Sequence, residues 1–201
     1  MKTHFTILAL TLFCALADGC GGSTSTGGAV TSTAATSAFT GYSSLSQYDL
    51  SKVINVQSAP YNAKGDGVTD DTNAISQALR DSYSATGNVT PVYIPKTDTF
   101  YKTGPQSLEP GSVVLSNGAT LAAPNGSNAN GISTLFYGQA IGNGNGGVIN
   151  PDNLKLIGPL TIELYNKTSY AVYALNSNGT VIKNVTVKGE LSSNPFYITN
   201  H

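Results

Sequence analysis

The chain has 201 residues, with 10 lysines and arginines against 11 aspartates and glutamates, and a formal net charge of −1. The basic residues form no cluster, so the sequence lacks the positive patch of a nucleic-acid-binding protein, and we expect no nucleic-acid partner. Only 10% of the residues are charged, and glycine, serine, threonine and asparagine are abundant, which favours short strands joined by turns over helices.

The N-terminal residues are typical of a secretory signal. Lys2 and His4 precede an almost wholly apolar run, residues 5–17, and small residues and Cys20 follow it. The run is shorter than the roughly 18 to 20 apolar residues that cross a bilayer, which disfavours a transmembrane helix. We therefore assign residues 1–20 to a signal and expect the protein to be exported.

The residues around Cys20, LADGC followed by GGSTST, resemble a bacterial lipoprotein signal, in which this cysteine is lipidated. The resemblance implies a protein held by a lipid anchor at the outer membrane or cell surface. Ordinary secretion, with Cys20 near the cleavage site, and an uncleaved anchor remain the alternatives.

Both cysteines of the chain, Cys14 and Cys20, lie in this signal, which leaves the mature protein no pair for a disulfide or a zinc site. We expect neither a metal nor a cofactor. Residues 21–47 are rich in serine, threonine and glycine and lack apolar periodicity, so they are predicted to form a disordered tether. The folded domain is then expected to span residues 48–201.

A turn followed by a helix is predicted near the start of this domain. Gly65, Asp66 and Gly67 suit a tight turn, because glycine adopts a positive φ without strain. Asp70 or Asp71 then caps a helix, since a carboxylate accepts hydrogen bonds from the free N–H groups of the first turn. The apolar residues that follow recur at helical spacing and predict an amphipathic helix of about three turns; they are Ala74, Ile75, Ala78, Leu79 and Tyr83.

This region carries a resemblance to a known family. The stretch INVQSAPYNAKGDGVTDDTNAISQAL, followed by VYIP, resembles the N-terminal signature of the pectin-lyase-like superfamily. The nearest branch is the rhamnogalacturonase and epimerase-like, pectate lyase type, which is similar to polygalacturonases and tailspike β-helices. The resemblance, which covers roughly residues 53–189, implies an all-β fold, a right-handed single-stranded parallel β-helix (solenoid), with an N-terminal α-helix that caps the first coil.

An internal repeat predicts a solenoid independently. LIGPLTI at residues 156–162 and VIKNVTV at residues 181–187 align without gaps, with Leu156 opposite Val181 at a spacing of 25 residues. A repeat of that size suits one coil, in which each rung stacks its apolar side chains on the previous one. From residue 112 onward there is room for about three to four such rungs.

The C-terminal residues predict an open end. A solenoid needs a polar cap at each end, because an open rung exposes its interior and its unpaired strand edge. Phe196, Tyr197 and Ile198 form an apolar strand instead. We therefore expect a chain that is truncated at its C-terminus or that requires a partner, and the sequence leaves the oligomeric state undetermined.

Candidate catalytic residues are not identified. Glycoside hydrolysis needs two carboxyl groups about 5 to 9.5 Å apart, and the resemblance to polygalacturonases implies such a pair on neighbouring rungs. The acids Asp152, Glu163 and Glu190 each stand singly, which favours solvated surface acids. The denser aspartates at positions 66, 70 and 71 lack the alternating oxygen ligands of a calcium loop, which favours a structural turn and helix cap.

Tyrosines offer a binding surface. Tyr165, Tyr170 and Tyr173 are candidates for stacking on the apolar faces of sugars, with packing of one or two of them in the interior as the alternative.

Two hypotheses about function follow. In the first, the chain is the N-terminal part of an exported hydrolase or lyase that acts on a pectin- or rhamnogalacturonan-like polysaccharide, with the catalytic rungs outside this chain. In the second, it is a non-catalytic β-helix that binds glycans or serves as a surface structural module. A polysaccharide is the expected ligand under the first hypothesis and under glycan binding in the second, but not under a structural role.

Overall fold

The computed structural model describes residues 45–84, 88–123, 134–138, 140–142, 148–168, 170–191 and 194–200. The predicted signal, Cys20 and residues 21–44 of the predicted tether lie outside this set. Among the described residues, no helix combines the length and the apolar character needed to span a membrane.

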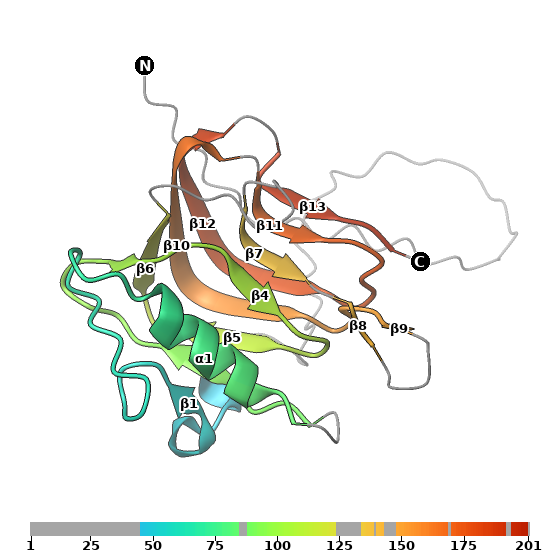
Figure 1. Ribbon diagram of the computed structural model, residues 1–201, viewed down its shortest axis with the longest axis horizontal. Helices are drawn as coiled ribbons and strands as arrows, with labels where there is room; N and C mark the ends of the chain where they lie inside the picture. Colours follow the sequence, from blue (N-terminus) through green and yellow to red (C-terminus); the bar gives the residue numbers. More distant parts are fainter. Residues whose placement is uncertain are drawn as a thin grey trace, which may run out of the picture.

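Parallel strands and one α-helix dominate the described part of the chain (Figure 1). The strands lie on three faces. The first face contains β1 (Ile54–Asn55), β2 (Val92–Ile94), β5 (Val113–Ser116) and the first residues of β10 (Lys155–Thr168) and β12 (Val181–Leu191). The second contains β3 (Tyr101–Lys102), β6 (Ala119–Ala123) and the later residues of β10 and β12. The third contains β4 (Gln106–Leu108), β7 (Thr134–Gly138), β11 (Tyr170–Ala174) and β13 (Phe196–Ile198).

Apart from β1 with β2 and one small hairpin, the strands pair from coil to coil and not with the next strand in sequence. Thus β2 pairs with β5, β5 with β10 and β10 with β12, each in parallel. A small hairpin, β8 (Ile141–Gly142) with β9 (Val148–Ile149), is antiparallel. Parallel strands need crossover connections, and here the crossover is a turn through the other faces. The arrangement agrees with the predicted all-β fold and parallel β-helix.

Inward-facing side chains stack in register between coils. On the first face the stack contains Ile54, Val92, Val114, Leu156 and Ile182. On the second face it contains Tyr101, Leu121, Ile162 and Val187. On the third face it contains Gln106, Phe136, Val172 and Phe196. The apolar members belong to, or pack against, one buried cluster. Burying each such side chain contributes about 1.5–3 kcal/mol, so apolar packing is the main source of stability in the described coils.

The predicted repeat is correct in its second half and wrong by one residue in its first half. Leu160 pairs with Val185, at the expected spacing, but Leu156 pairs with Ile182 and not with Val181. The register shifts between these positions because Gly158 and Pro159 together face a single residue, Asn184. Such a β-bulge adds one residue to one strand, which a gapless comparison of the two segments does not detect.

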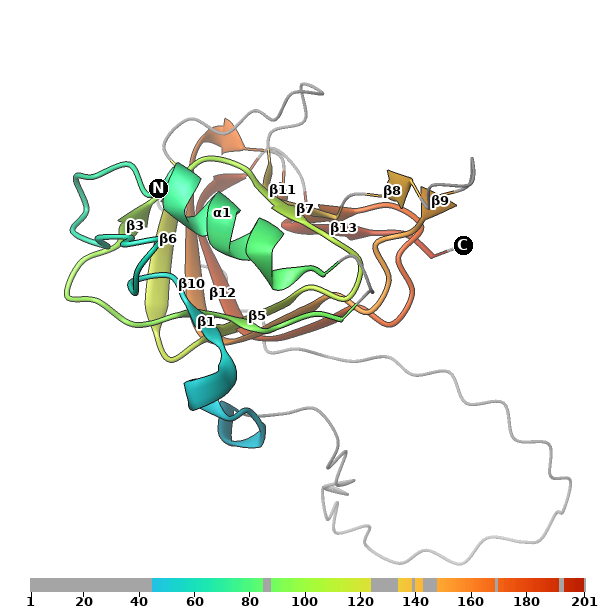
Figure 2. The same ribbon diagram turned by 60° about the horizontal axis from the view of Figure 1, so that its bottom comes forward.

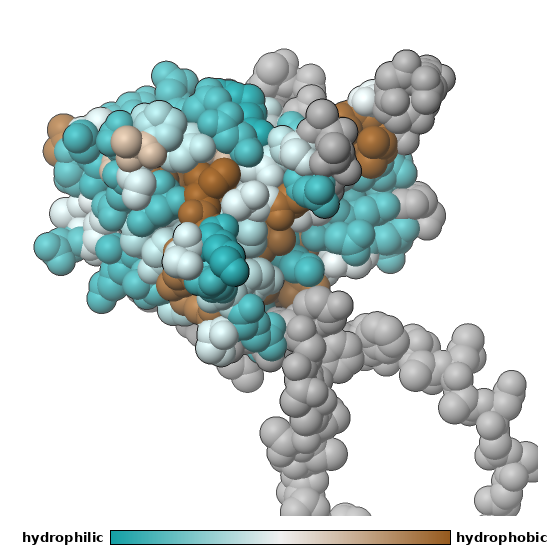
Figure 3. Space-filling view, turned by 90° about the horizontal axis from the view of Figure 1, so that it is seen from below, coloured by the Kyte–Doolittle hydropathy of each residue, from teal (hydrophilic) through white to brown (hydrophobic). Residues whose placement is uncertain are grey.

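The outer side of the first face carries a second apolar cluster. Tyr93, Val113, Leu115 and Ile157 are buried there, and Val181 packs against them. Leu45, Tyr48 and Val53 cover this cluster from the N-terminal side. They flank or belong to two 3₁₀ helices, Leu45–Gln47 and Leu50–Lys52, of which the first lies within the predicted tether. The surface seen from below is mostly hydrophilic, with small hydrophobic patches (Figure 3).

The predicted amphipathic helix is present as α1 (Thr72–Ser82). Its buried residues are Ile75, Ala78, Leu79 and Ser82, while Ala74 is partly buried against the main cluster. The helix packs on β4 and also contacts β1 and β2 (Figure 2). The Ser76 hydroxyl donates a hydrogen bond to the Gln106 side chain on β4 (2.8 Å), which ties α1 to the edge of the third face.

Candidate functional site

The glycine-rich turn of the sequence motif is packed against the first coil. Gly65 has φ +59°, and a Cβ at this position would lie 2.6 Å from the Thr97 side chain and 2.9 Å from the Tyr101 ring. Gly67 has φ +77° and donates its N–H to the Phe100 carbonyl (2.9 Å). Both positions therefore favour glycine because of their positive φ. At Gly65 a larger residue would also clash with its neighbours.

The three aspartates of the motif bind backbone groups. Asp66 accepts the N–H groups of Val68 and Thr69 (2.9 and 2.7 Å), and these bonds lower the pKa of its carboxyl. Asp70 accepts the hydroxyl and the N–H of Thr72, the first residue of α1, and these bonds likewise lower its pKa. Among the described residues, no cluster of three or more acidic, histidine or cysteine side chains is placed to hold a metal ion.

The Asp71 side chain binds the glycine turn and not the helix. Asp71 occupies the position before α1, yet its side chain makes no capping bond to the helix. Its carboxylate accepts the N–H groups of Lys64 (2.7 Å) and Gly65 (2.9 Å) and is only 2% exposed. Of the two alternatives, Asp70 thus binds the first turn of the helix, while Asp71 holds the glycine turn, because that turn folds back over it.

A column of tyrosines lies on the outer side of the third face. Ser107 on β4 pairs with Tyr137 on β7, Tyr137 pairs with Tyr173 on β11, and Tyr173 pairs with Tyr197 on β13. The inward neighbours Phe136 and Val172 are fully buried. Because successive residues of a strand point to opposite faces, this column points outward. We call Tyr137, Tyr173, Tyr197 and the adjacent Tyr170 the tyrosine face.

Three of the four rings of the tyrosine face, those of Tyr170, Tyr173 and Tyr197, are close together. Tyr173 and Tyr197 stack with centroids 5.3 Å apart and an interplanar angle of 11°. Tyr170 lies 5.3 Å from Tyr173 and 5.5 Å from Tyr197, tilted against both. Tyr197 is 42% exposed and the other three are partly exposed. The arrangement is an accessible aromatic surface that extends over several coils.

Two of the three predicted tyrosines belong to this surface. Tyr170 and Tyr173 are there, whereas the side chain of Tyr165 lies outside the described part of the chain. Sequence reasoning missed Tyr137 and Tyr197. A usable signal was present in the triplets FYG, VYA and FYI, in which tyrosine follows an inward-facing apolar residue on each coil.

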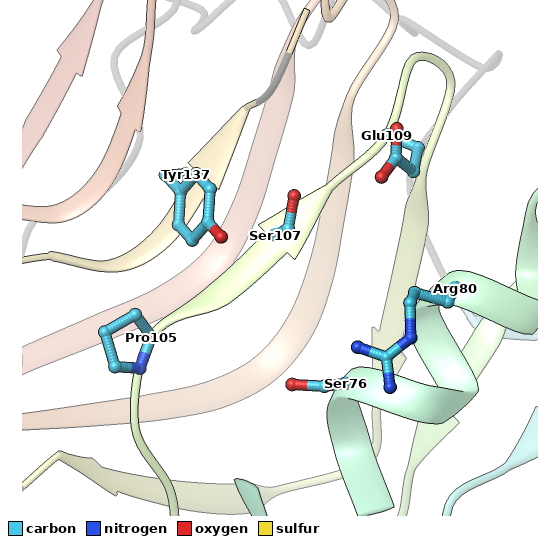
Figure 4. A pocket seen from close by; sticks show the side chains of 6 residues that line it. All are labelled: Ser76, Arg80, Pro105, Ser107, Glu109 and Tyr137. Carbon is cyan, nitrogen blue, oxygen red and sulfur yellow. The ribbon is translucent and has the colours of Figure 1, made fainter. Parts of the chain in front are cut away.

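A pocket adjoins the tyrosine face at the end nearest α1. It has a volume of about 210 Å³ and is lined by Ser76, Arg80, Pro105, Ser107, Glu109 and Tyr137 (Figure 4). Ser107 and Tyr137 belong to both the column and the pocket. Burial raises the pKa of the Glu109 carboxyl, and its Oε2 atom is buried without a hydrogen-bond partner.

The three acids considered for catalysis do not form a pair in the described residues. The Asp152 side chain accepts the N–H of Asn178 (2.7 Å) in the turn before β10. Glu163 lies on the second face, 3.8 Å from the Lys188 ammonium. The side chain of Glu190 lies outside the described part of the chain. The first two are thus engaged in local contacts at separate places.

A family model matches part of the chain. The family model described as rhamnogalacturonase A/epimerase, pectate lyase-like, matches residues 53–100. No curated protein and no solved structure matches the chain. The matched residues contain β1, the glycine turn, α1 and β2, which are the elements that begin the coil. The match and the parallel strands together support the pectin-lyase-like superfamily, a fold of carbohydrate-active proteins.

Proposed function

We propose that this protein is an exported β-helix that binds a polysaccharide along its tyrosine face. The observation that carries the proposal is the outward column of tyrosines at equivalent positions of successive coils. Aromatic rings pack well on the apolar faces of sugars, while the tyrosine hydroxyls can form hydrogen bonds with polar groups at the edge of the sugar ring.

The geometry suits a polymer with a repeating unit. Neighbouring parallel strands lie about 4.8 Å apart, so the column offers rings at regular steps across the strands. Tyr173 and Tyr197 form a nearly flat stacked pair, and Tyr170 adds a tilted ring beside them. Tyrosine loses little conformational freedom on binding because it has few rotatable bonds, which favours recognition by such a surface.

The match to a rhamnogalacturonase and epimerase family model keeps a second proposal open. In it, the chain is part of a polysaccharide hydrolase or lyase, and α1 caps the first coil of the enzyme. The pocket beside α1 contains one acid of raised pKa, Glu109, whereas hydrolysis on two carboxyl groups needs a partner. Release of new reducing ends or unsaturated products from a pectic polymer would favour this second proposal over binding alone.

The location of the protein is part of the proposal. Lipidation at Cys20 would anchor the chain at the outer membrane or cell surface, with residues 21–44 as a tether that lets the tyrosine face reach an extracellular polymer.

Binding to immobilised polysaccharides tests the main proposal. We expect the double variant Tyr173→Ala/Tyr197→Ala to lose at least about tenfold in affinity, because it removes the stacked pair. Tyr173→Phe/Tyr197→Phe should keep most of the affinity, since the rings remain. Leu175→Ala, at a residue that is 43% exposed just after β11, is the surface control. Equal binding by wild type and the double alanine variant would refute the proposal.

A further inference from the structure

The pocket between α1 and the third face has the amphipathic character of a sugar site. Pro105 and the Tyr137 ring supply apolar walls, while Ser76, Arg80, Ser107 and Glu109 supply polar groups (Figure 4). Its volume of about 210 Å³ suits a small group such as one sugar unit.

The position of the pocket links it to the tyrosine face. Ser107 on β4 is the first member of the outward column, and Tyr137 on β7 is the next. Ser76 and Arg80 belong to α1, which packs on β4. A polymer lying along the column would therefore place the unit nearest α1 in this pocket.

The pocket lining carries two charged side chains of opposite sign. The pocket lining contains one guanidinium, that of Arg80, and one carboxyl, that of Glu109. The strands β4, β7, β11 and β13 contribute no charged residue to the third face. An acidic sugar would be attracted by Arg80 and repelled by the Glu109 carboxylate. These two effects oppose each other, so the negative charge of the sugar would add little to the free energy of binding. A polyanion would also find no row of cations along the tyrosine face.

Hydroxyl groups suit these side chains better than a carboxylate does. A sugar hydroxyl can donate to the Glu109 carboxylate in the pocket lining, while an adjacent hydroxyl accepts from the Arg80 guanidinium. Hydrogen bonds to ionised groups are stronger than those between neutral groups. We infer that this pocket binds one uncharged, hydroxyl-rich sugar unit through Glu109 and Arg80, and that the polysaccharide of the proposed function, on which this inference rests, is neutral where it contacts the protein.

Titration of the full mature chain with soluble polysaccharides tests the inference. The probes are uncharged glucans, mannans and galactans, with polygalacturonate as the acidic polymer. We expect tighter binding to at least one neutral polymer than to polygalacturonate, with little dependence on salt, since attraction to a polyanion would be screened by salt.

Pocket variants separate this inference from the proposed function. Glu109→Gln and Arg80→Gln should each lower affinity for the neutral polymer by about tenfold, because each removes a charge-assisted hydrogen bond. Glu163→Gln, on the second face, and Lys52→Gln, at an exposed residue, are the matched controls. Thermal unfolding checks that each variant is folded.

The possible outcomes are distinct. Loss of binding in the tyrosine variants with no change in the pocket variants would overturn the inference and leave the proposed function standing. A preference for polygalacturonate that salt weakens would also overturn it. If no polysaccharide binds, the proposed function fails and the inference fails with it.

Discussion

At the scale of single residues, two glycines allow β12 to pair closely with β10. A Cβ on Gly158 would lie 2.0 Å from the carbonyl oxygen of Asn184, and a Cβ on Gly189 would lie 1.8 Å from that of Leu164. Gly158 is part of the bulge that shifts the register, and Gly189 has φ +111°. In both cases the obstacle is backbone, which cannot rotate away as a side chain can. The close approach of two coils at the bulges therefore depends on the absence of a side chain.

The substitution Gly158→Ala should lower the free energy of unfolding by about 1–3 kcal/mol, because the methyl group forces the β10 and β12 backbones apart. Chemical denaturation measures the change. Gly142→Ala is the control, since a Cβ there meets no atom within 4 Å, and it should change stability by less than about 0.5 kcal/mol. Equal stability of the two variants would contradict the described register.

At the scale of elements, the stability of α1 depends on the packing of its one buried side. Ile75 and Ala78 are fully buried and Leu79 is 2% exposed, whereas Asn73 on the other side is exposed. An isolated helix of this length is marginal in water, so its stability comes from tertiary packing. The helical period of the apolar residues was readable from the sequence. The role of Asp71 was not, because its carboxylate bonds to a turn that only the folded chain brings over it.

Ile75→Ala should destabilise the protein by about 2–5 kcal/mol, since it leaves a cavity between α1 and the first coil. Asn73→Ala removes an exposed side chain from the same helix and should be neutral or slightly stabilising, because alanine has the higher helix propensity. Urea unfolding of both variants measures the difference. A small effect of Ile75→Ala would mean that α1 is not part of the cooperative fold.

At the scale of the whole molecule, the first face lies between two apolar clusters. The main cluster fills the interior, and the outer cluster lies beneath Leu45, Tyr48 and Val53. Strands buried on both sides have nearly continuous apolar sequences, as in residues 113–115. The residues that cover the outer cluster come from the segment before β1, so this segment completes the packing of the fold.

The double variant Leu45→Ala/Tyr48→Ala should expose the outer cluster, and we expect increased binding of a hydrophobic dye and a lower unfolding midpoint. Leu50→Ala is the control within the same segment, because Leu50 is 43% exposed and lies outside both clusters. Unchanged dye binding in the double variant would show that these residues do not cover the first face in solution.

The sequence by itself determined the parallel coil, the glycine turn, the amphipathic helix and half of the repeat register, because these depend on local propensity and on the spacing of apolar residues. Tertiary structure decided the rest. A bulge moved the partner of Leu156 from Val181 to Ile182, and the third face brought Tyr137 and Tyr197 into line with Tyr173. Crossovers of unequal length separate equivalent residues, so their alignment depends on strand pairing, which no local pattern encodes.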